Sequence, residues 1–406
     1  MSIASHTDSY PVKNFFKNLS QVFAVVTAFV LPLSTAALMS FFFFFVFCAV
    51  LAGDWQEKYL ILRSNPVALM FVLFFGLFLI GLSYTTVPLP DALHTLIKYS
   101  KFLLGFFLFS TFRHEKTAVY AFAAFLFAAS ITLLLSLFKF FADWDLLHRF
   151  VSDSGVFKDH IFTGFLLAFS SYCYAVLAFS IKKGWRWFFA LLFLVSVYDV
   201  LFINLGRSGY VVLLSLILLL AWQHFSWQGL VTSILVSIFL LSSLLFLPAN
   251  FKDRLNLVHR EINQYQHGNF DTSVGLRLEF YKNSLKLLAK HPWIGTGTGS
   301  FSHDYFNVAE DKQFVTQNPH NEYLNIAVQF GLVGVVVLSA MFLVHWRQSF
   351  RLTGIRQRFA QAVLTTIVVG SVFNSWLMDV SQGCFYVFFT ALLLANLSQS
   401  PQRKIS

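Results

Sequence analysis

The 406-residue sequence has few charged side chains, which excludes most classes of soluble protein. Asp, Glu, Lys and Arg make up 12% of the residues, about half the fraction usual in soluble domains. Hydrophobic residues make up 57%, including 52 Phe, and apolar runs long enough to cross a bilayer as helices recur along the chain. The alternating pattern of a membrane β-barrel is absent. The sequence therefore predicts an all-α, polytopic membrane protein.

Cysteine and metal-ligand patterns are also scarce. Cys48, Cys173 and Cys384 lie in three different apolar runs, without a CxxC pair or a histidine at metal-ligand spacing, and we interpret them as small buried apolar side chains. Asp143 and Asp145 follow the fifth apolar run and could bind a divalent cation, but two carboxylates without further ligands are weak support for such a site. We expect no metal and no cofactor.

Twelve apolar runs predict transmembrane helices, at 19–34, 35–53, 66–83, 95–112, 117–141, 161–181, 187–205, 209–223, 228–247, 320–345, 359–379 and 381–397. With both termini in the cytoplasm, about half of the 29 Lys and Arg lie in inner loops and tails, as the positive-inside rule expects. The net charge of +10 follows this layout, so we expect no nucleic-acid partner. No small-residue cleavage site follows Lys13 and Lys17, and the first run is expected to remain as a signal anchor.

One connection is long, and it divides the membrane domain into residues 1–247 with helices one to nine, a periplasmic loop at 248–318, and residues 319–406 with helices ten to twelve. A loop of this length among short ones is usually functional. Its segment 276–291 has an apolar helical face and a basic one, which includes Arg277 and Lys282. This helix is expected either to lie in the membrane interface, with its cations toward lipid phosphates, or to pack on the protein. The following GTGTGSF is expected to be a flexible turn, because no GK[ST] follows it.

Asn318, Pro319 and His320 stand immediately before an apolar run. Asn is a preferred N-cap and Pro a preferred first helical residue, so a helix is expected to begin here with His320 in its first turn. The positive end of the helix dipole then disfavours imidazolium and keeps His320 neutral, able to accept a proton near pH 7. Glu322 would oppose this effect if it approached the ring. A purely structural, hydrogen-bonding histidine is the alternative.

Two arginines are expected on the same outer side as His320. Arg207 lies in NLGRSGY between two apolar runs, where it needs a carboxylate or phosphate partner unless it extends to water or lipid phosphate. Arg277 opens the loop helix. Three separate segments thus bring two guanidinium groups and an imidazole to one membrane face. This combination suits transfer chemistry on a lipid-linked diphosphate, since the arginines can bind the diphosphate while a neutral histidine takes a proton from the attacking hydroxyl.

The stretches GRSGY, RLEFYKNSLKLLAKHPWIGTGTGSF and NPHNEYLNIAVQFGLVG resemble the O-antigen ligase superfamily of bacterial envelope glycosyltransferases, over about residues 204–335. The resemblance implies a GT-C-type enzyme at the periplasmic face of the inner membrane. It would move a glycan from undecaprenyl diphosphate to a sugar hydroxyl of the lipid A-core, without metal or ATP, and we expect inversion at the anomeric carbon.

The same resemblance assigns roles to individual residues. It matches Arg207, Arg277 and His320 to the family's catalytic residues, and it places Asn321 and Tyr323 in the site. Lys282, on the basic face of the loop helix, is also expected to contact substrate. The expected partners are therefore the undecaprenyl-diphosphate-linked glycan, the lipid A-core and the surrounding membrane lipids.

Two other functions remain open. An O-antigen polymerase would use the same donor with a second lipid-linked glycan as acceptor, although a single loop of roughly 70 residues fits a ligase better. A secondary transporter also has a twelve-helix layout and would depend on Asp199 and Asp379, which lie in or near apolar runs. Transporters usually place such residues at mid-membrane, whereas the candidates found here gather at one face.

Overall fold

The computed structural model describes residues 9–142, 155–181, 184–204, 206–243, 249–268, 270–309 and 314–397, and within these ranges every regular element is a helix. The elements are α1 (Ser9–Val30), α2 (Thr35–Leu51), α3 (Trp55–Ser64), α4 (Pro66–Gly81), α5 (Leu89–Thr111), α6 (Glu115–Ala142), α8 (His160–Ser180), α9 (Trp185–Tyr198), the π-helix η1 (Asp199–Ile203), α10 (Arg207–Ser243), α11 (Ala249–Gln266), α12 (Ser273–Lys290), α13 (Phe301–Val308), α14 (Glu322–Ser349), α15 (Gly354–Gly370) and α16 (Val380–Leu394).

Among the described residues, six helices are long and apolar enough to cross a membrane: α5, α6, α8, α9 with η1, α10 and α14. The pair α2 and α3, bent by 110°, passes the same test together, and α4 and α16 are shorter apolar helices. The prediction of an all-helical, polytopic membrane protein is thereby confirmed. Asp143 and Asp145, the weak candidates for a cation site, lie outside the described residues.

The helix boundaries differ from the prediction at several points, two of which change the number or type of elements. The span predicted at 209–223 and the described part of the next span, residues 228–243, lie in one continuous helix, α10, because the polar stretch between them contains no proline to break it. The segment Trp55–Ser64, predicted as part of a loop, forms the short helix α3. The count of twelve spans therefore stays a prediction.

The core where α4, α5, α14 and α16 meet is largely aromatic. Phe71, Phe74, Phe78, Tyr99 and Phe102 are fully buried, and their rings meet in pairs, such as the Phe74–Phe102 pair with centroids 4.9 Å apart. In a bilayer, apolar burial contributes little to helix association because lipid is as apolar as the protein interior, so packing has to hold the helices together. Edge-to-face ring pairs contribute about 0.5–1.5 kcal/mol each. Abundant Phe thus gives a stiff core beside α14.

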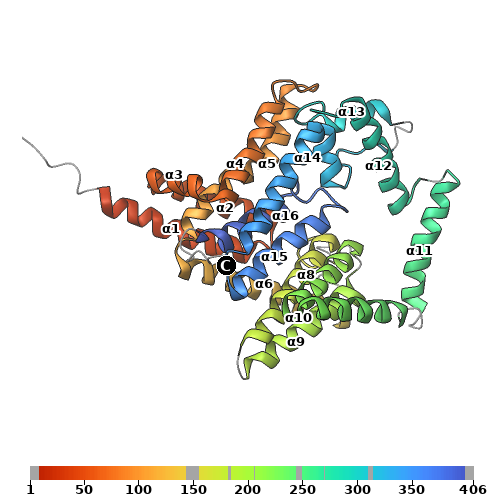
Figure 1. Cartoon of the computed structure of the whole chain (residues 1–406), viewed down its shortest axis with the longest axis horizontal. Helices are drawn as coiled ribbons and strands as arrows, with labels where there is room; N and C mark the ends of the chain where they lie inside the picture. Colours follow the sequence, from red (N-terminus) through yellow and green to blue (C-terminus); the bar gives the residue numbers. More distant parts are fainter. Residues whose placement is uncertain are drawn as a thin grey trace, which may run out of the picture.

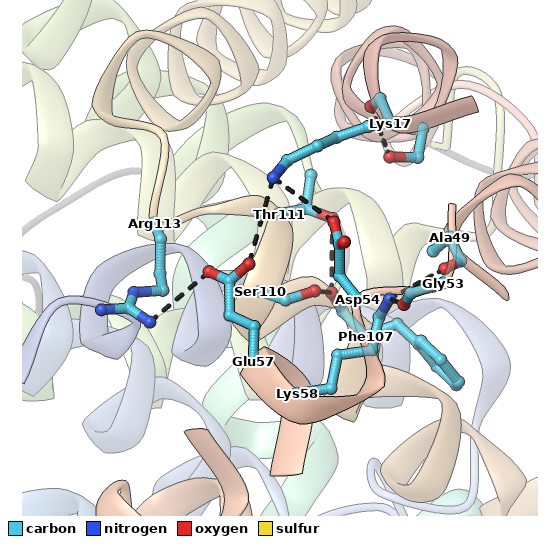
Figure 2. A network of polar contacts seen from close by, with 11 residues as sticks. Lys17, Ala49, Gly53, Asp54, Glu57, Lys58, Phe107, Ser110, Thr111 and Arg113 are labelled. Atoms are coloured by element: carbon cyan, nitrogen blue, oxygen red, sulfur yellow. Dashed lines mark hydrogen bonds and ion pairs between the residues drawn. The ribbon is translucent and has the colours of Figure 1, made fainter. Parts of the chain in front are cut away.

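A network of charged side chains marks one end of α5, after Thr111 (Figure 2). Lys17 of α1 lies 3.5 Å from Asp54 and 4.0 Å from Glu57, and Arg113 lies 3.5 Å from the other oxygen of Glu57. Lys58 turns away from these acids and donates to the backbone oxygens of Ala49 and Gly53. At 1.5 Å per residue, α5 rises about 30 Å from Asp91 to Thr111, close to the thickness of the hydrocarbon core. The opposite end of α5, near Asp91, lies beside the candidate site.

The described part of the long loop contains three helices, although only one was predicted. α11 runs along one side of the molecule from the end of α10 to α12, while α12 and α13 lie over one end of α14 (Figure 1). α11 was not predicted because its sequence is polar. The helix ends at Gln266, two residues before Gly268, which has a φ of +85°.

The glycine-rich segment after α12 packs tightly and is not the flexible turn that was expected. α14 breaks at Gly331, which has a φ of +60°, and residues 292–297 fill the break. Gly297 donates its N–H to the Gln329 oxygen at 2.8 Å, and Leu332 donates to the Pro292 oxygen at 2.8 Å. A Cβ on Gly297 would lie 2.4 Å from the backbone of Thr85. The break therefore fixes the loop to α14 and to the start of α5.

Candidate active site

Arg207 is positioned by close contact between two helices. It is the first residue of α10, and the glycines on either side of it let this end of α10 approach α8. A Cβ on Gly209 would lie 3.1 Å from the backbone of Gly164, and a Cβ on Gly206 would lie 2.7 Å from the backbone oxygen of His160. The glycines of the NLGRSGY stretch thus set where the arginine stands.

The side chain of Arg207 forms a two-pronged ion pair with Glu261 of α11. Nη1 and Nη2 each lie 3.2 Å from one carboxylate oxygen. The Glu261 side chain is 8% exposed, whereas the Arg207 side chain is 37% exposed. The carboxylate is therefore buried in the protein, and the guanidinium faces outward. Glu261 also accepts the Val274 N–H at 3.2 Å. The predicted need of Arg207 for a carboxylate or phosphate partner is met here by a residue that sequence reasoning did not single out.

Arg277 stands in the first turns of α12, close to the first pair. Burial is the main cause that lowers the pKa of the Arg277 guanidinium. The charge of Arg207 also lowers this pKa, whereas Tyr281 and Glu261 raise it. Arginine nevertheless stays protonated at any physiological pH. Arg207 and Arg277 therefore place two positive charges near one carboxylate, which leaves the group net cationic and suited to an anion.

The apolar face of α12 packs on the protein. Of the two alternatives expected for this helix, lying in the membrane interface or packing on the protein, the contacts agree with the second. Phe280 and Leu287 of α12 join a second apolar cluster with Phe301 and Tyr305 of α13 and Val328 of α14. Arg277, on the same helix, is half-buried.

Lys282 lies on the outside of α12 and not with the two arginines. Its side chain is 45% exposed, and its Nζ lies 3.5 Å from Glu279. The geometry therefore gives Lys282 no contact with Arg207, Arg277 or His320.

His320 lies just before α14 and not in its first turn, so the predicted helix start is wrong. The N-cap is Asn321, whose Oδ1 accepts the Leu324 N–H at 3.0 Å, and the helix begins at Glu322. His320 itself has a φ of +52°, a left-handed conformation that is uncommon for a residue with a side chain. Asn318 supports this turn by accepting the His320 N–H at 2.8 Å. Asn318 thus caps the turn that presents the imidazole.

Two residues of α12 hold His320, one at its ring and one at its backbone. Its ring stacks on Phe280 of α12 with centroids 5.8 Å apart, and the hydroxyl of Tyr281 donates to the His320 backbone oxygen at 3.2 Å. Burial lowers the pKa of His320, and the positive charge of Arg277 lowers it further, while the bond to Asn374 opposes both. The ring is therefore neutral near pH 7, as predicted. The physical cause is burial beside a cation, and Glu322 takes no part.

Asn374, which sequence reasoning missed, fixes which nitrogen of His320 carries the proton. Its Oδ1 lies 3.1 Å from Nδ1 of His320 and also accepts the Ser375 N–H at 2.9 Å, while its Nδ2 donates to Asp379 at 3.1 Å. The amide is thus oriented with its oxygen toward the ring, so Nδ1 must be the donor. Nε2 then carries the lone pair and is the nitrogen able to accept a proton.

The other two predicted site residues have structural partners. Asn321 donates to the Val372 oxygen at 3.1 Å in addition to capping α14. The hydroxyl of Tyr323 donates to the Val368 oxygen of α15 at 2.8 Å. Both fix the start of α14 against α15 and the following turn. Asn321 also shares a hydrogen bond with the Tyr281 side chain, which links it to the wall behind His320.

Three of the six predicted residues are thus brought together. The charges of Arg207 and Glu261 both affect the pKa of Arg277, and the charge of Arg277 affects the pKa of His320. Among the described residues, no three side chains of His, Cys, Asp or Glu are grouped as metal ligands. What this arrangement can do is bind an anion with two guanidinium groups and accept a proton with a neutral imidazole beside them.

Such a site on a bundle of membrane helices defines a membrane protein with an anion-binding, proton-accepting centre, and a comparison with known families narrows the class. The family described as O-antigen ligase matches residues 189–339, a region that holds Arg207, Arg277 and His320. The match supports the O-antigen ligase superfamily, which the motifs also indicated. Members of this family are glycosyltransferase-like ligases and polymerases, and the match supports a function of that general type.

One curated relative is similar over part of the chain. An uncharacterized protein of Haemophilus influenzae is 26% identical over 145 residues, which is 34% of this chain and 36% of the relative. The chain therefore spans about a third of the length of the curated relative it matches.

Proposed function

We propose that the protein is an O-antigen ligase of the bacterial inner membrane, which transfers a glycan from undecaprenyl diphosphate to a sugar hydroxyl of the lipid A-core at the periplasmic face. The single observation that supports this best is the position of α12, the helix of Arg277: its Val274 N–H bonds to Glu261, the partner of Arg207, and its Phe280 and Tyr281 contact His320. An anion-binding pair of guanidinium groups and a neutral imidazole would supply the two functions that transfer from a diphosphate donor requires.

The diphosphate of the donor binds to Arg207 and Arg277. A guanidinium has five N–H donors, and the pair with Glu261 uses two of those on Arg207. Within the described residues, no other hydrogen bond uses the remaining donors of Arg207 or those of Arg277, so these donors can contact phosphate oxygens. As the bond between the anomeric carbon and the diphosphate breaks, its electron pair goes to the leaving diphosphate, and the two positive charges stabilise it.

His320 takes the proton of the acceptor. The hydroxyl oxygen attacks the anomeric carbon from the face opposite the diphosphate, and its proton passes to Nε2 of His320. Asn374 retains the proton on Nδ1, so the ring becomes imidazolium during the step. The lowered pKa of His320 ensures that it starts unprotonated near neutral pH. Inversion at the anomeric carbon follows from this direction of attack.

Deletion of the gene, followed by examination of the envelope polysaccharide, tests the proposal. A ligase mutant accumulates undecaprenyl-linked polymer and has a bare core. A core that bears a single repeat unit would identify a polymerase instead, and a complete ladder of chain lengths would refute both. Complementation with His320→Ala should leave the ladder absent, whereas the conservative surface variant Lys282→Arg should restore it.

A further inference from the structure

A polar pocket lies beside the candidate site, and none of the six predicted site residues lines it. Its cavity has a volume of 140 Å³. A cavity of about 150 Å³ in another protein holds benzene, so the space admits one six-membered ring. The lining comes from the first turns of α5, the segment before and within α13, and the start of α14, together with Gln317 and Met378. Gln317 stands three residues before His320, and Met378 belongs to the turn that contains Asn374.

A stripe of polar residues on α5 forms one wall of this pocket. Asp91, His94, Thr95 and Lys98 follow each other at helical spacing and share one face. The side chains of Asp91, His94 and Lys98 have no hydrogen bond or ion pair within the part of the chain that the structure describes. On a membrane helix, polar groups without a protein partner that face a hollow are available to a ligand.

The opposite wall is rigid and amide-rich. Asn325 and Gln329 of α14 are 1% exposed, and Gln329 accepts the Gly299 N–H at 2.8 Å while donating to Asn325 at 3.0 Å. Their other hydrogen bonds go to Tyr99, to the sulfur of Met378 and to the backbone of α14. Because the amide groups of Asn325 and Gln329 all have hydrogen-bond partners within the protein, the shape of this wall is fixed before any ligand binds.

We propose that this pocket binds a sugar ring of the acceptor. A saccharide hydroxyl both donates and accepts, and the pocket offers an acceptor in Asp91, a donor in Lys98, and groups of both kinds in His94, His303 and Gln317. An isolated phosphate would meet the carboxylate of Asp91, which opposes an anion. The mixture of charges and amides therefore fits a polyhydroxylated ligand.

The position of the pocket assigns it to the acceptor and not to the donor, an assignment that rests on the proposed function. None of its described lining residues belongs to α10, α11 or α12, the helices that carry Arg207, Glu261 and Arg277. In an inverting displacement the attacking hydroxyl and the leaving diphosphate lie on opposite faces of the anomeric carbon. Gln317 of the pocket stands three residues before His320, and Met378 of the pocket stands four residues after Asn374, which bonds the imidazole. A sugar in the pocket would therefore lie next to the turn that holds the proposed base.

Steady-state kinetics of the full-length protein in lipid nanodiscs tests this inference. The donor is the undecaprenyl-diphosphate-linked glycan and the acceptor is purified lipid A-core, each varied while the other is saturating. Lys98→Ala should raise the acceptor KM roughly 10-fold and His94→Ala roughly 3-fold, as expected for the loss of one charged and one neutral hydrogen bond. The donor KM should change less than about twofold, since the change is confined to the acceptor site. Lys290→Ala and His291→Ala, which replace exposed residues of the same two types at the end of α12, should leave both constants unchanged.

Binding of the free core oligosaccharide, followed by saturation-transfer NMR without donor, separates this inference from the proposed function. His320→Ala should retain the binding signal, and Lys98→Ala should lose most of it. A donor KM that rises in place of the acceptor KM, or unchanged acceptor KM and binding in both pocket variants, would overturn the acceptor pocket and leave the catalytic proposal standing. Transfer by His320→Ala at the wild-type rate would refute the catalytic proposal, and the NMR result would still decide the pocket.

Discussion

Replacing Asn374 should shift the pH dependence of transfer in opposite directions for two variants. Asn374 accepts from Nδ1 of His320 over 3.1 Å, and this bond raises the pKa of the imidazole against the lowering effects of burial and Arg277. Asn374→Ala removes the bond, so the pKa should fall and the acid limb of the rate profile should move to lower pH. Both tautomers also become available, and the loss of one neutral hydrogen bond predicts a rate reduction of roughly 2- to 10-fold.

Asn374→Asp should move the acid limb the other way. A carboxylate about 4 Å from the imidazolium charge contributes about 4 kcal/mol at an effective dielectric constant of about 20, which would correspond to about three pKa units. Asp379 lies 3.1 Å from the amide nitrogen of Asn374, and its charge repels the new carboxylate and removes much of this effect. A rise of about one pKa unit is therefore expected.

The assay is the initial rate of glycan transfer by purified protein between about pH 4.5 and pH 8, with ordinary histidine at about 6.5 as the reference. The wild-type acid limb should have its midpoint below that reference, because His320 must be unprotonated to act as a base and its pKa is lowered. Asn374→Ala should have a lower midpoint and Asn374→Asp a higher one. Identical midpoints for all three proteins would show that His320 is not the titrating base or that Asn374 does not orient it.

Three further variants test the support of the site. Arg277→Lys should reduce transfer roughly 10- to 100-fold because a point charge cannot replace a guanidinium fork, and wild-type rates would reduce Arg277 to a surface cation. Glu261→Ala should lower the melting temperature in detergent, since Arg207 loses its partner and the Val274 N–H loses an acceptor, whereas an unchanged melting temperature would show that the pair contributes nothing to the fold. Gly209→Val should lower both the melting temperature and the activity, because its Cβ would meet the backbone of α8 at 3.1 Å; Gly76→Val, where nothing lies within 4 Å, is the control, and equal stability of the two would contradict the close-contact account.

The apolar helices could be predicted from the sequence because a bilayer requires only length and apolarity of them. α11 could not, since its polar sequence lacks an apolar run, and no local signal broke α10 after residue 223. The start of α14 was misplaced because Asn318 and Asn321 are equally good N-caps when only neighbouring residues are considered. Asn321 is the N-cap in the structure because a tertiary contact favours it: its side chain donates to the Val372 oxygen.

The candidate site was predictable only in part, for a similar reason. Arg207 and His320 stand out because charged or titratable groups beside apolar runs are costly and therefore informative. Glu261 and Asn374 have no such mark, since each lies 54 residues from the partner it supports. Glu261 lies in a segment that looks like an ordinary polar loop, and Asn374 lies in a stretch predicted as part of an apolar span. The polar stripe at Asp91, His94 and Lys98 was present in the sequence at helical spacing, but its meaning depends on the pocket opposite it.

The central claim is that His320, beside Arg207 and Arg277, is the base in a glycosyl transfer. Its most direct test is the rate at which purified protein in nanodiscs moves glycan from undecaprenyl diphosphate to lipid A-core, with wild type and His320→Ala compared at pH 7. The account predicts transfer by the wild type and a loss of roughly 10²- to 10⁴-fold in the variant. Equal rates for the two proteins would contradict it.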